Sequence, residues 1–185
     1  MRYFFIDTET GGLDPNNASL LQIAVVVVDD AFNIIDKLYL KTRPYYSVFM
    51  VHPKALDVNG IDIVQHARNA VSYEYASQKI KDFIYDHRKF DEYAVWAGWN
   101  VQFDLKFLNH YIVEADILTY RMFDAQSLFH FYVTHVKNEP CSMSLTNAAK
   151  YFGFDSDGLH KSALEDVLMT IKITQEIRDR IVCLS

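Results

Sequence analysis

The chain has 185 residues, of which 50% are hydrophobic and 15% are aromatic. That composition can build a packed core, and it excludes intrinsically disordered, collagen-like and coiled-coil proteins. Eighteen basic and 24 acidic residues give a net charge of −6 with histidine neutral, whereas proteins that bind nucleic acid over a broad surface are usually basic. Any nucleic acid would therefore be held locally or through metal ions. The length fits one domain over residues 1–185.

Cysteine content and hydropathy indicate the cellular compartment. Cys141 and Cys183 are too few for a disulfide framework and are expected to be reduced thiols. The longest apolar run, residues 23–28, has the length of a strand and is far shorter than a membrane span. The apolar stretch at the amino terminus is too short for a signal peptide. We therefore expect a cytoplasmic protein with no membrane segment.

In chain order, the sequence opens with three strand-like runs. These are residues 3–8, 20–28 and 32–41, and Asp29 and Asp30 form a turn between the last two. The second run is almost continuously apolar, which is typical of a strand covered on both faces. Hydrophobic spacing then predicts helices at residues 53–59, 71–90, 102–114, 125–136, 144–152 and 162–181, with strands at residues 93–97 and 121–123. This order predicts an α/β fold with a central mixed five-stranded sheet flanked by helices.

Two acids close the first predicted strand. Asp7 and Glu9 share one face of it, because side chains alternate along a strand. A carboxylate pair on a mostly buried strand is costly to desolvate unless something compensates its charge. A divalent cation such as Mg²⁺, which prefers oxygen ligands, does so well. The pair is also consistent with two solvated acids beside the turn at Gly11 and Gly12.

Three further residues are candidates for a functional site. Asp104 follows the strand at residues 93–97 and falls in the first turn of a helix, where an acid also simply favours the helix dipole. Asp166 lies at the margin of the core face of the last helix, whereas its neighbour Glu165 is expected to be solvated. His160 lies six residues before Asp166 in a loop. Taken singly, a histidine of this kind is more often structural or solvated.

Three segments that contain these residues occur in a characteristic order. They are Asp7-Thr8-Glu9-Thr10-Gly11-Gly12-Leu13, Asn100-Val101-Gln102-Phe103-Asp104 and His160-Lys161-Ser162-Ala163-Leu164-Glu165-Asp166. They resemble the three exonuclease motifs of the DEDDh (DnaQ-like) 3′–5′ exonucleases, a family that includes the proofreading subunit of bacterial replicative DNA polymerase, ribonuclease T and oligoribonuclease. The resemblance covers nearly the whole chain. It implies a ribonuclease H-like fold and hydrolysis of phosphodiester bonds from a 3′ end, with release of nucleoside 5′-monophosphates.

The resemblance also implies a role for each motif residue. Asp7, Glu9 and Asp166 would hold the cation that activates water. Asp7 and Asp104 would hold a second cation near the leaving 3′ oxygen. Both cations would be Mg²⁺, with Mn²⁺ able to substitute. His160 would accept the proton of the attacking water, a task that suits a group titrating near neutral pH.

The third motif departs from the family pattern. Five residues separate His160 from Asp166, where the family usually has four. An alignment through Ala163 would place Lys161 at the position of the family's histidine. We expect His160 to be the base, because loops absorb single-residue insertions and because lysine is normally protonated near pH 7.

The remaining candidates are substrate contacts, expected to hold the terminal nucleotide by stacking and wedging. They are Thr8, Leu13, Asn59, Trp99, Asn100 and Phe103. Trp99 and Phe103 are equally consistent with core aromatics. In the family, the proofreading subunit has a histidine where Asn59 stands and a threonine where Gly11 stands.

The expected partners are nucleic acid 3′ ends, with a DNA polymerase as a further partner that the resemblance leaves open. The first expectation is DNA, as single strands or frayed ends. An RNA-directed exoribonuclease of the ribonuclease T or oligoribonuclease kind is the alternative, because no residue that reads a ribose 2′-hydroxyl can be identified. A catalytically silent binding module is the rival from another class, and the four carboxylates speak against it.

Overall fold

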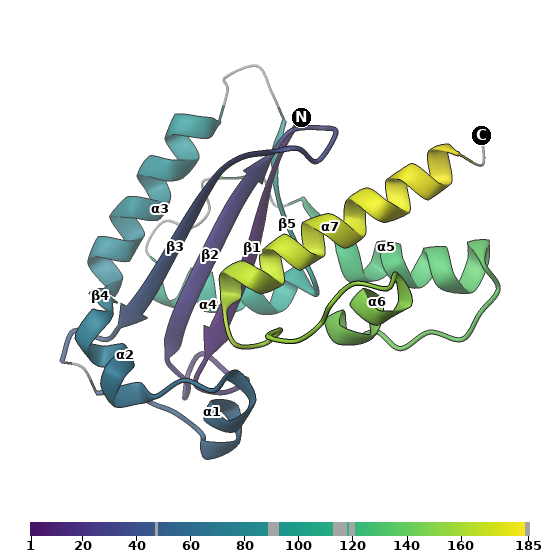
Figure 1. The fold of residues 1–185 in the computed structure, drawn as a ribbon. Helices are drawn as coiled ribbons and strands as arrows, with labels where there is room; N and C mark the ends of the chain where they lie inside the picture. The colour runs from purple at the N-terminus through teal and green to yellow at the C-terminus, as the bar shows by residue number, and fades with distance from the viewer. Residues whose placement is uncertain (47, 89–92, 113–117, 119–120, 184–185) are drawn as a thin grey trace.

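One sheet of six strands forms the centre of the protein (Figure 1). The computed structural model describes residues 1–46, 48–88, 93–112, 118 and 121–183. The strands lie in the order β4-β3-β2-β1-β5-β6. β1 pairs antiparallel with β2 and parallel with β5, so the sheet is mixed, as predicted. The strands are β1 (Arg2–Thr10), β2 (Leu20–Val28), β3 (Ile34–Arg43), β4 (Val71–Ser72), β5 (Ala94–Gly98) and β6 (Met122–Asp124).

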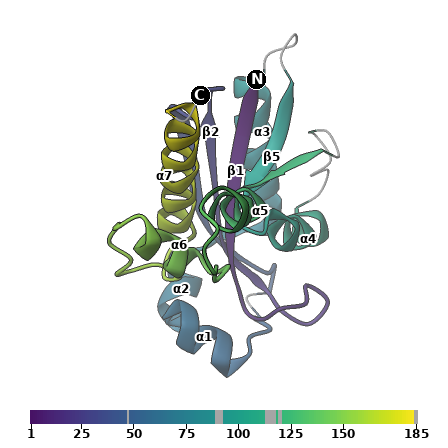
Figure 2. The ribbon, with the colours of Figure 1, turned by 90° about the vertical axis from the view of Figure 1, so that its right-hand side faces the viewer.

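Helices cover both faces of the sheet. Figure 2 shows α7 on one side of β1 and β2, with α3 on the other. The helical elements are α1 (Pro53–Asn59), α2 (Ile63–Asn69), α3 (Tyr73–His87), α4 (Val101–Tyr111), α5 (Ala125–Phe131), the π-helix η1 (Tyr132–Val136), α6 (Leu145–Tyr151) and α7 (Ala163–Val182). None of the described helices combines the length and the apolar character that crossing a bilayer requires.

The alternation of side chains along β1 builds two cores. Phe4 and Ile6 point to the face covered by α3 and α4, where they join Ile80 and Phe107. Phe5 points to the opposite face and packs in the cluster that contains Ala163, Val167 and Ile171 of α7. Because both faces of the strand are covered, its apolar residues are almost completely buried. β1 therefore runs through the middle of the protein and carries its last residues to one end of the sheet.

The predicted elements are present, with differences at their ends. β3 begins two residues later than predicted, because the Asp29 carboxylate accepts hydrogen bonds from the backbone N–H groups of Ala31 and Asn33 and so prolongs the turn. Residues 125–136 form α5 followed by the π-helix, rather than one regular helix. The predicted helix ends at Phe90 and Glu114 lie outside the described residues.

The region between β3 and α3 is where the sequence prediction was incomplete. α2 was not predicted; it begins at the N-cap Asp62, whose carboxylate accepts from the N–H groups of Val64 and Gln65. The predicted helix at residues 71–90 begins only at Tyr73. Val71 and Ser72 instead pair with β3 as β4, which makes the sheet six-stranded rather than five-stranded.

Candidate active site

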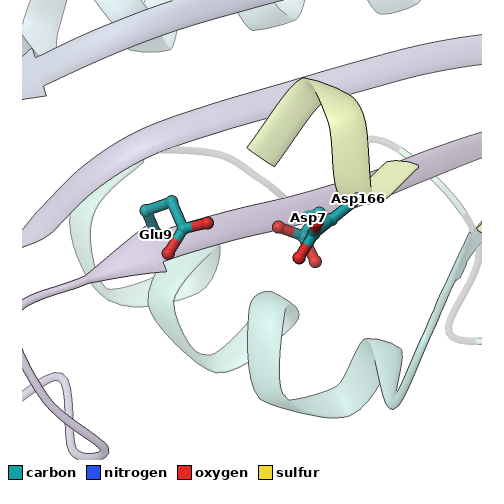
Figure 3. Close-up of side chains that lie close together, drawn as sticks. All are labelled: Asp7, Glu9 and Asp166. Carbon is teal, nitrogen blue, oxygen red and sulfur yellow. The ribbon is translucent and has the colours of Figure 1, made fainter. Parts of the chain in front are cut away.

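Three carboxylates converge at the end of β1. Asp7 and Glu9 project from β1, and Asp166 comes from the first turn of α7 (Figure 3). One carboxylate oxygen from each residue lies within 4.8 Å of the other two. Asp166 and Glu9 are buried, with 3% and 9% of their surface exposed. The expected alternation of β1 thus places two acids on one face, and the start of α7 delivers the third to them.

Burial and the neighbouring negative charges raise the pKa values of Asp7 and Glu9. Burial is the largest cause for Asp7, followed by the charges of Asp104, Asp166 and Glu9, and together they hold its pKa well above the usual range. Burial, then the charges of Asp166 and Asp104, raises the pKa of Glu9 to about 8. Oxygen ligands that repel one another in a buried position fit a hard divalent cation, which neutralises the charge and satisfies the oxygens.

Asp104 reaches the site from the other side of β1. It is buried in the first turn of α4, and the Thr8 hydroxyl donates a 2.7 Å hydrogen bond to its Oδ1. Burial raises the pKa of Asp104 to about 7, opposed by the Thr8 hydrogen bond and reinforced by the charge of Asp166. Gly98 allows the close approach that sets this position. A Cβ there would lie 2.8 Å from the Ile6 carbonyl oxygen and 3.2 Å from Cβ of Val101, so it would push the end of β5 away from β1 and crowd the first residue of α4.

His160 is held against Asp166 by its backbone and by its ring. The residue adopts a left-handed backbone conformation, with φ of 67°. Its N–H donates to both oxygens of Asp166, at 3.0 and 3.2 Å. Nδ1 lies 3.2 Å from Oδ2 of Asp166, and Nε2 lies 3.0 Å from Oγ1 of Thr146. The hydrogen bond to Asp166 raises the pKa of His160, although burial acts in the opposite direction.

Lys161 takes a different position from its neighbour. Its side chain is exposed, whereas the His160 side chain lines a cavity with the four carboxylates. The extra residue between His160 and Asp166 is accommodated in the loop before α7. The structure therefore brings His160, and not Lys161, to the acids.

Two adjoining cavities hold the remaining predicted residues. The smaller, of about 290 Å³, is lined by the four carboxylates, His160 and the predicted contacts Thr8, Trp99, Asn100 and Phe103. The larger, of about 850 Å³, is lined by Leu13, Asn59, Thr8, Glu9 and Phe103 among others. Leu13 is 86% exposed, so its side chain stands free at the rim. Every predicted site residue therefore lines one or both of these two adjoining cavities.

Several of the predicted contact residues also make structural hydrogen bonds. The Asn59 amide is buried, donates to the Thr10 carbonyl and accepts from the Ile61 N–H. It thereby ties α1 to the end of β1. Trp99 donates its indole N–H to the Met143 carbonyl at 3.0 Å and packs against Phe129.

Sequence reasoning missed residues that support the site from neighbouring elements. Thr146, at the start of α6, meets the His160 ring, and no local signal distinguishes it from an ordinary helix residue. Gln22 on β2 accepts hydrogen bonds from the Ala163 N–H and from the Tyr39 hydroxyl, which anchors the start of α7. A polar residue in the apolar run at residues 20–28 was the available signal for Gln22.

Comparisons with known proteins show which family this sequence matches. A family model described as RNase_T exonuclease matches residues 4–174. Ribonuclease T of Shewanella denitrificans is 29% identical over 187 residues, covering 95% of this chain and 79% of that protein. Oligoribonuclease of Haemophilus ducreyi is 27% identical over 133 residues, covering 67% and 70%.

Solved structures agree with the fold. Escherichia coli exonuclease I in complex with a dT13 oligonucleotide matches with a TM-score of 0.77 at 19% identity, covering 99% of this chain and 42% of that one. Exonuclease I of Methylocaldum szegediense matches with a TM-score of 0.78 at 21% identity, covering 97% and 40%. The predicted ribonuclease H-like fold class is confirmed, and the chain spans about two fifths of the length of these solved structures.

Proposed function

This chain belongs to the RNase_T family of 3′–5′ exonucleases, and we propose that its four carboxylates and His160 hydrolyse the terminal phosphodiester bond at a nucleic acid 3′ end. The products are a nucleoside 5′-monophosphate and a strand shortened by one nucleotide. The observation that carries the proposal is the meeting of Asp7, Glu9, Asp104, Asp166 and His160 around one cavity. We assign residues 1–185 to a single exonuclease domain.

The carboxylates are the proposed ligands of two divalent cations. Asp7, Glu9 and Asp166 would hold one, since their oxygens already lie within 4.8 Å of one another. Asp7 and Asp104 would hold the second. When bound, such cations offset the charge of the phosphate and lower the pKa of a bound water. Mg²⁺ is the proposed ion, with Mn²⁺ able to substitute, because both accept an all-oxygen ligand set.

His160 is the proposed general base. Its ring lies at the edge of the carboxylate cluster, and its side chain is 44% exposed, so water can reach it. Asp166 and Thr146 engage its two ring nitrogens. One nitrogen must exchange its present partner for the attacking water before the proton can be accepted. A base of this kind contributes about 100-fold or more to the rate.

The proposed substrate is DNA with a single-stranded or frayed 3′ end. The solved exonuclease I structures that share this fold include a complex with single-stranded DNA and complexes with dT13 and dA16 oligonucleotides. RNA is the alternative substrate, favoured by the similarity to ribonuclease T over 95% of this chain. A proofreading role with a DNA polymerase as partner is a further candidate, which rests only on the resemblance of the motifs to the proofreading subunit.

One assay separates these substrates and tests the activity. Purified protein is incubated with 3′-labelled single-stranded DNA, mismatched duplex, RNA or dinucleotides, in Mg²⁺, Mn²⁺ or chelator. Release of labelled mononucleotide in metal, but not in chelator, supports the proposal, and the order of rates identifies the substrate. Asp7→Asn serves as the inactive control. Wild-type protein that releases nothing from any of the four substrates would refute the proposed function and support a silent binding module.

A further inference from the structure

Basic charge gathers in one stretch of this acidic protein. Residues 41–68 contain Lys41, Arg43, Lys54 and Arg68 against Asp57 and Asp62. This stretch therefore has a net charge of +2, and with a total of −6 the rest of the chain carries −8. The stretch runs from the end of β3 through α1 and into α2. A polyanion that approaches the protein meets the least repulsion there.

The same stretch exposes two adjacent aromatic side chains. Tyr45 is 69% exposed and Tyr46 is 83% exposed. Their rings meet edge to face, with centroids 4.8 Å apart. Neither contributes to a core cluster among the described residues. Aromatic rings beside basic side chains are the usual means of holding single-stranded nucleic acid, since every base presents a face on which a ring can stack.

The stretch leads directly into the active-site cavities. The Met50 carbonyl accepts a hydrogen bond from the Ser19 N–H, and the His52 N–H donates to the Gly11 carbonyl. These two bonds join the stretch to the connection between β1 and β2, in which Gly11 and Ser19 lie. His52 and Lys54 line the 850 Å³ cavity. That cavity shares Thr8, Glu9 and Phe103 with the smaller cavity of the four carboxylates.

The sheet topology explains why these features lie together. β1 and β3 run in the same direction, because each is antiparallel to β2 between them. Both strands therefore end at the same side of the sheet, where α1 and α2 lie (Figure 1). Tyr45 and Tyr46 follow the end of β3, as the catalytic acids mark the end of β1.

We propose that residues 41–46 and 48–68 form an extended binding surface for single-stranded nucleic acid, which holds the nucleotides on the 5′ side of the one being removed. Bases stack on Tyr45 and Tyr46, and Lys54 contacts the backbone phosphates between them and the cavity. The proposal rests on the proposed function, because the strand is assumed to place its 3′ end at the carboxylates. It predicts that long strands bind more tightly than dinucleotides.

The test compares long and short substrates in matched variants. The double variant Tyr45→Ala/Tyr46→Ala removes both rings, and Tyr85→Ala removes a tyrosine of α3 that is 64% exposed. KM and kcat are measured with a dinucleotide and with a single strand of about 12 nucleotides, a length within the usual range of single-strand binding sites. We expect KM for the longer strand to rise about 10-fold in the double variant, with dinucleotide turnover unchanged and Tyr85→Ala behaving as wild type.

Binding in chelator provides a reading that does not depend on catalysis. Fluorescence anisotropy of the labelled longer strand should show the same loss of affinity in the double variant. Lys54→Ala should lower the salt dependence of binding by about one phosphate contact. Equal affinities of wild type and double variant would overturn the surface, even if dinucleotides are hydrolysed. A double variant whose oligomeric mass differs from that of wild type, while its affinity for the labelled strand is unchanged, would also overturn the surface. That result would assign the tyrosines to a protein–protein contact. Failure of hydrolysis with the binding differences intact would count against the proposed function alone.

Discussion

Replacing Glu9 with glutamine should stabilise the metal-free protein at alkaline pH. In the folded chain, burial and the charges of Asp166 and Asp104 raise the pKa of Glu9 from 4.5 to about 8. Between these values the folded state keeps a proton that the unfolded state has lost, so the free energy of unfolding falls as pH rises. The shift corresponds to on the order of 5 kcal/mol at about 1.4 kcal/mol per pKa unit. That stability is fully present below pH 4.5 and is lost by about pH 8.

Glutamine carries no charge at any of these pH values, so the variant avoids the free-energy cost of holding an ionised carboxylate in this buried, acidic position. In chelator, urea unfolding from about pH 5 to about pH 9 should show a shallower loss of stability in Glu9→Gln than in wild type, by about one proton. The variant should be inactive, and adding Mg²⁺ should stabilise it less than wild type. Glu165→Gln is the control and should follow wild type, because it changes an exposed carboxylate next to Asp166 in the first turn of α7. Identical pH slopes in wild type and Glu9→Gln, or lower stability of the variant at the alkaline end, would refute the electrostatic reasoning.

The other predictions concern the reaction itself. Chelation should abolish nucleotide release and Mg²⁺ or Mn²⁺ should restore it; full activity in excess chelator would contradict the two-cation proposal. His160→Ala should lower kcat by about 100-fold or more, the scale of a lost general base, whereas Lys161→Ala should mainly raise KM; the reverse pattern in steady-state kinetics would assign the base to Lys161. Blocking the 3′ hydroxyl of a labelled strand should prevent its degradation and blocking the 5′ end should not, whereas rapid cutting of closed circular single strands would show an endonuclease.

Periodicity and composition sufficed for the elements that form the core. The run at residues 20–28 was predicted with its observed bounds, because an apolar strand covered on both faces differs clearly from its flanks. The elements within residues 61–72 were harder to predict from the sequence. α2 is only seven residues long, and Val71 and Ser72 become a strand through pairing with β3, a partner about 30 residues earlier in the chain. The spacing of hydrophobic residues within one segment cannot predict such a pairing.

The site shows the same division between local and distant information. The acids were found because they stand at strand and helix ends within motifs of defined spacing. The hydrogen bond from Thr8 to Asp104 joins residues 96 positions apart. The contact between Thr146 and His160 depends on how α6 packs near the loop before α7. Partners of this kind are set by tertiary packing, so no pattern within a single segment predicts them.

The central position of β1 also determines how the site behaves on slow timescales. Residues 2–5 pair with β5, and Asp7 and Glu9 lie opposite Ala24 and Gln22 of β2. Separating β1 from its neighbours would expose both cores, so its amide hydrogens should exchange with solvent only through the largest openings of the protein. The spacing of the two acids is therefore preorganised before any cation arrives. Cation binding to the folded state should therefore slow amide exchange throughout β1, by the factor that corresponds to the gain in the free energy of unfolding.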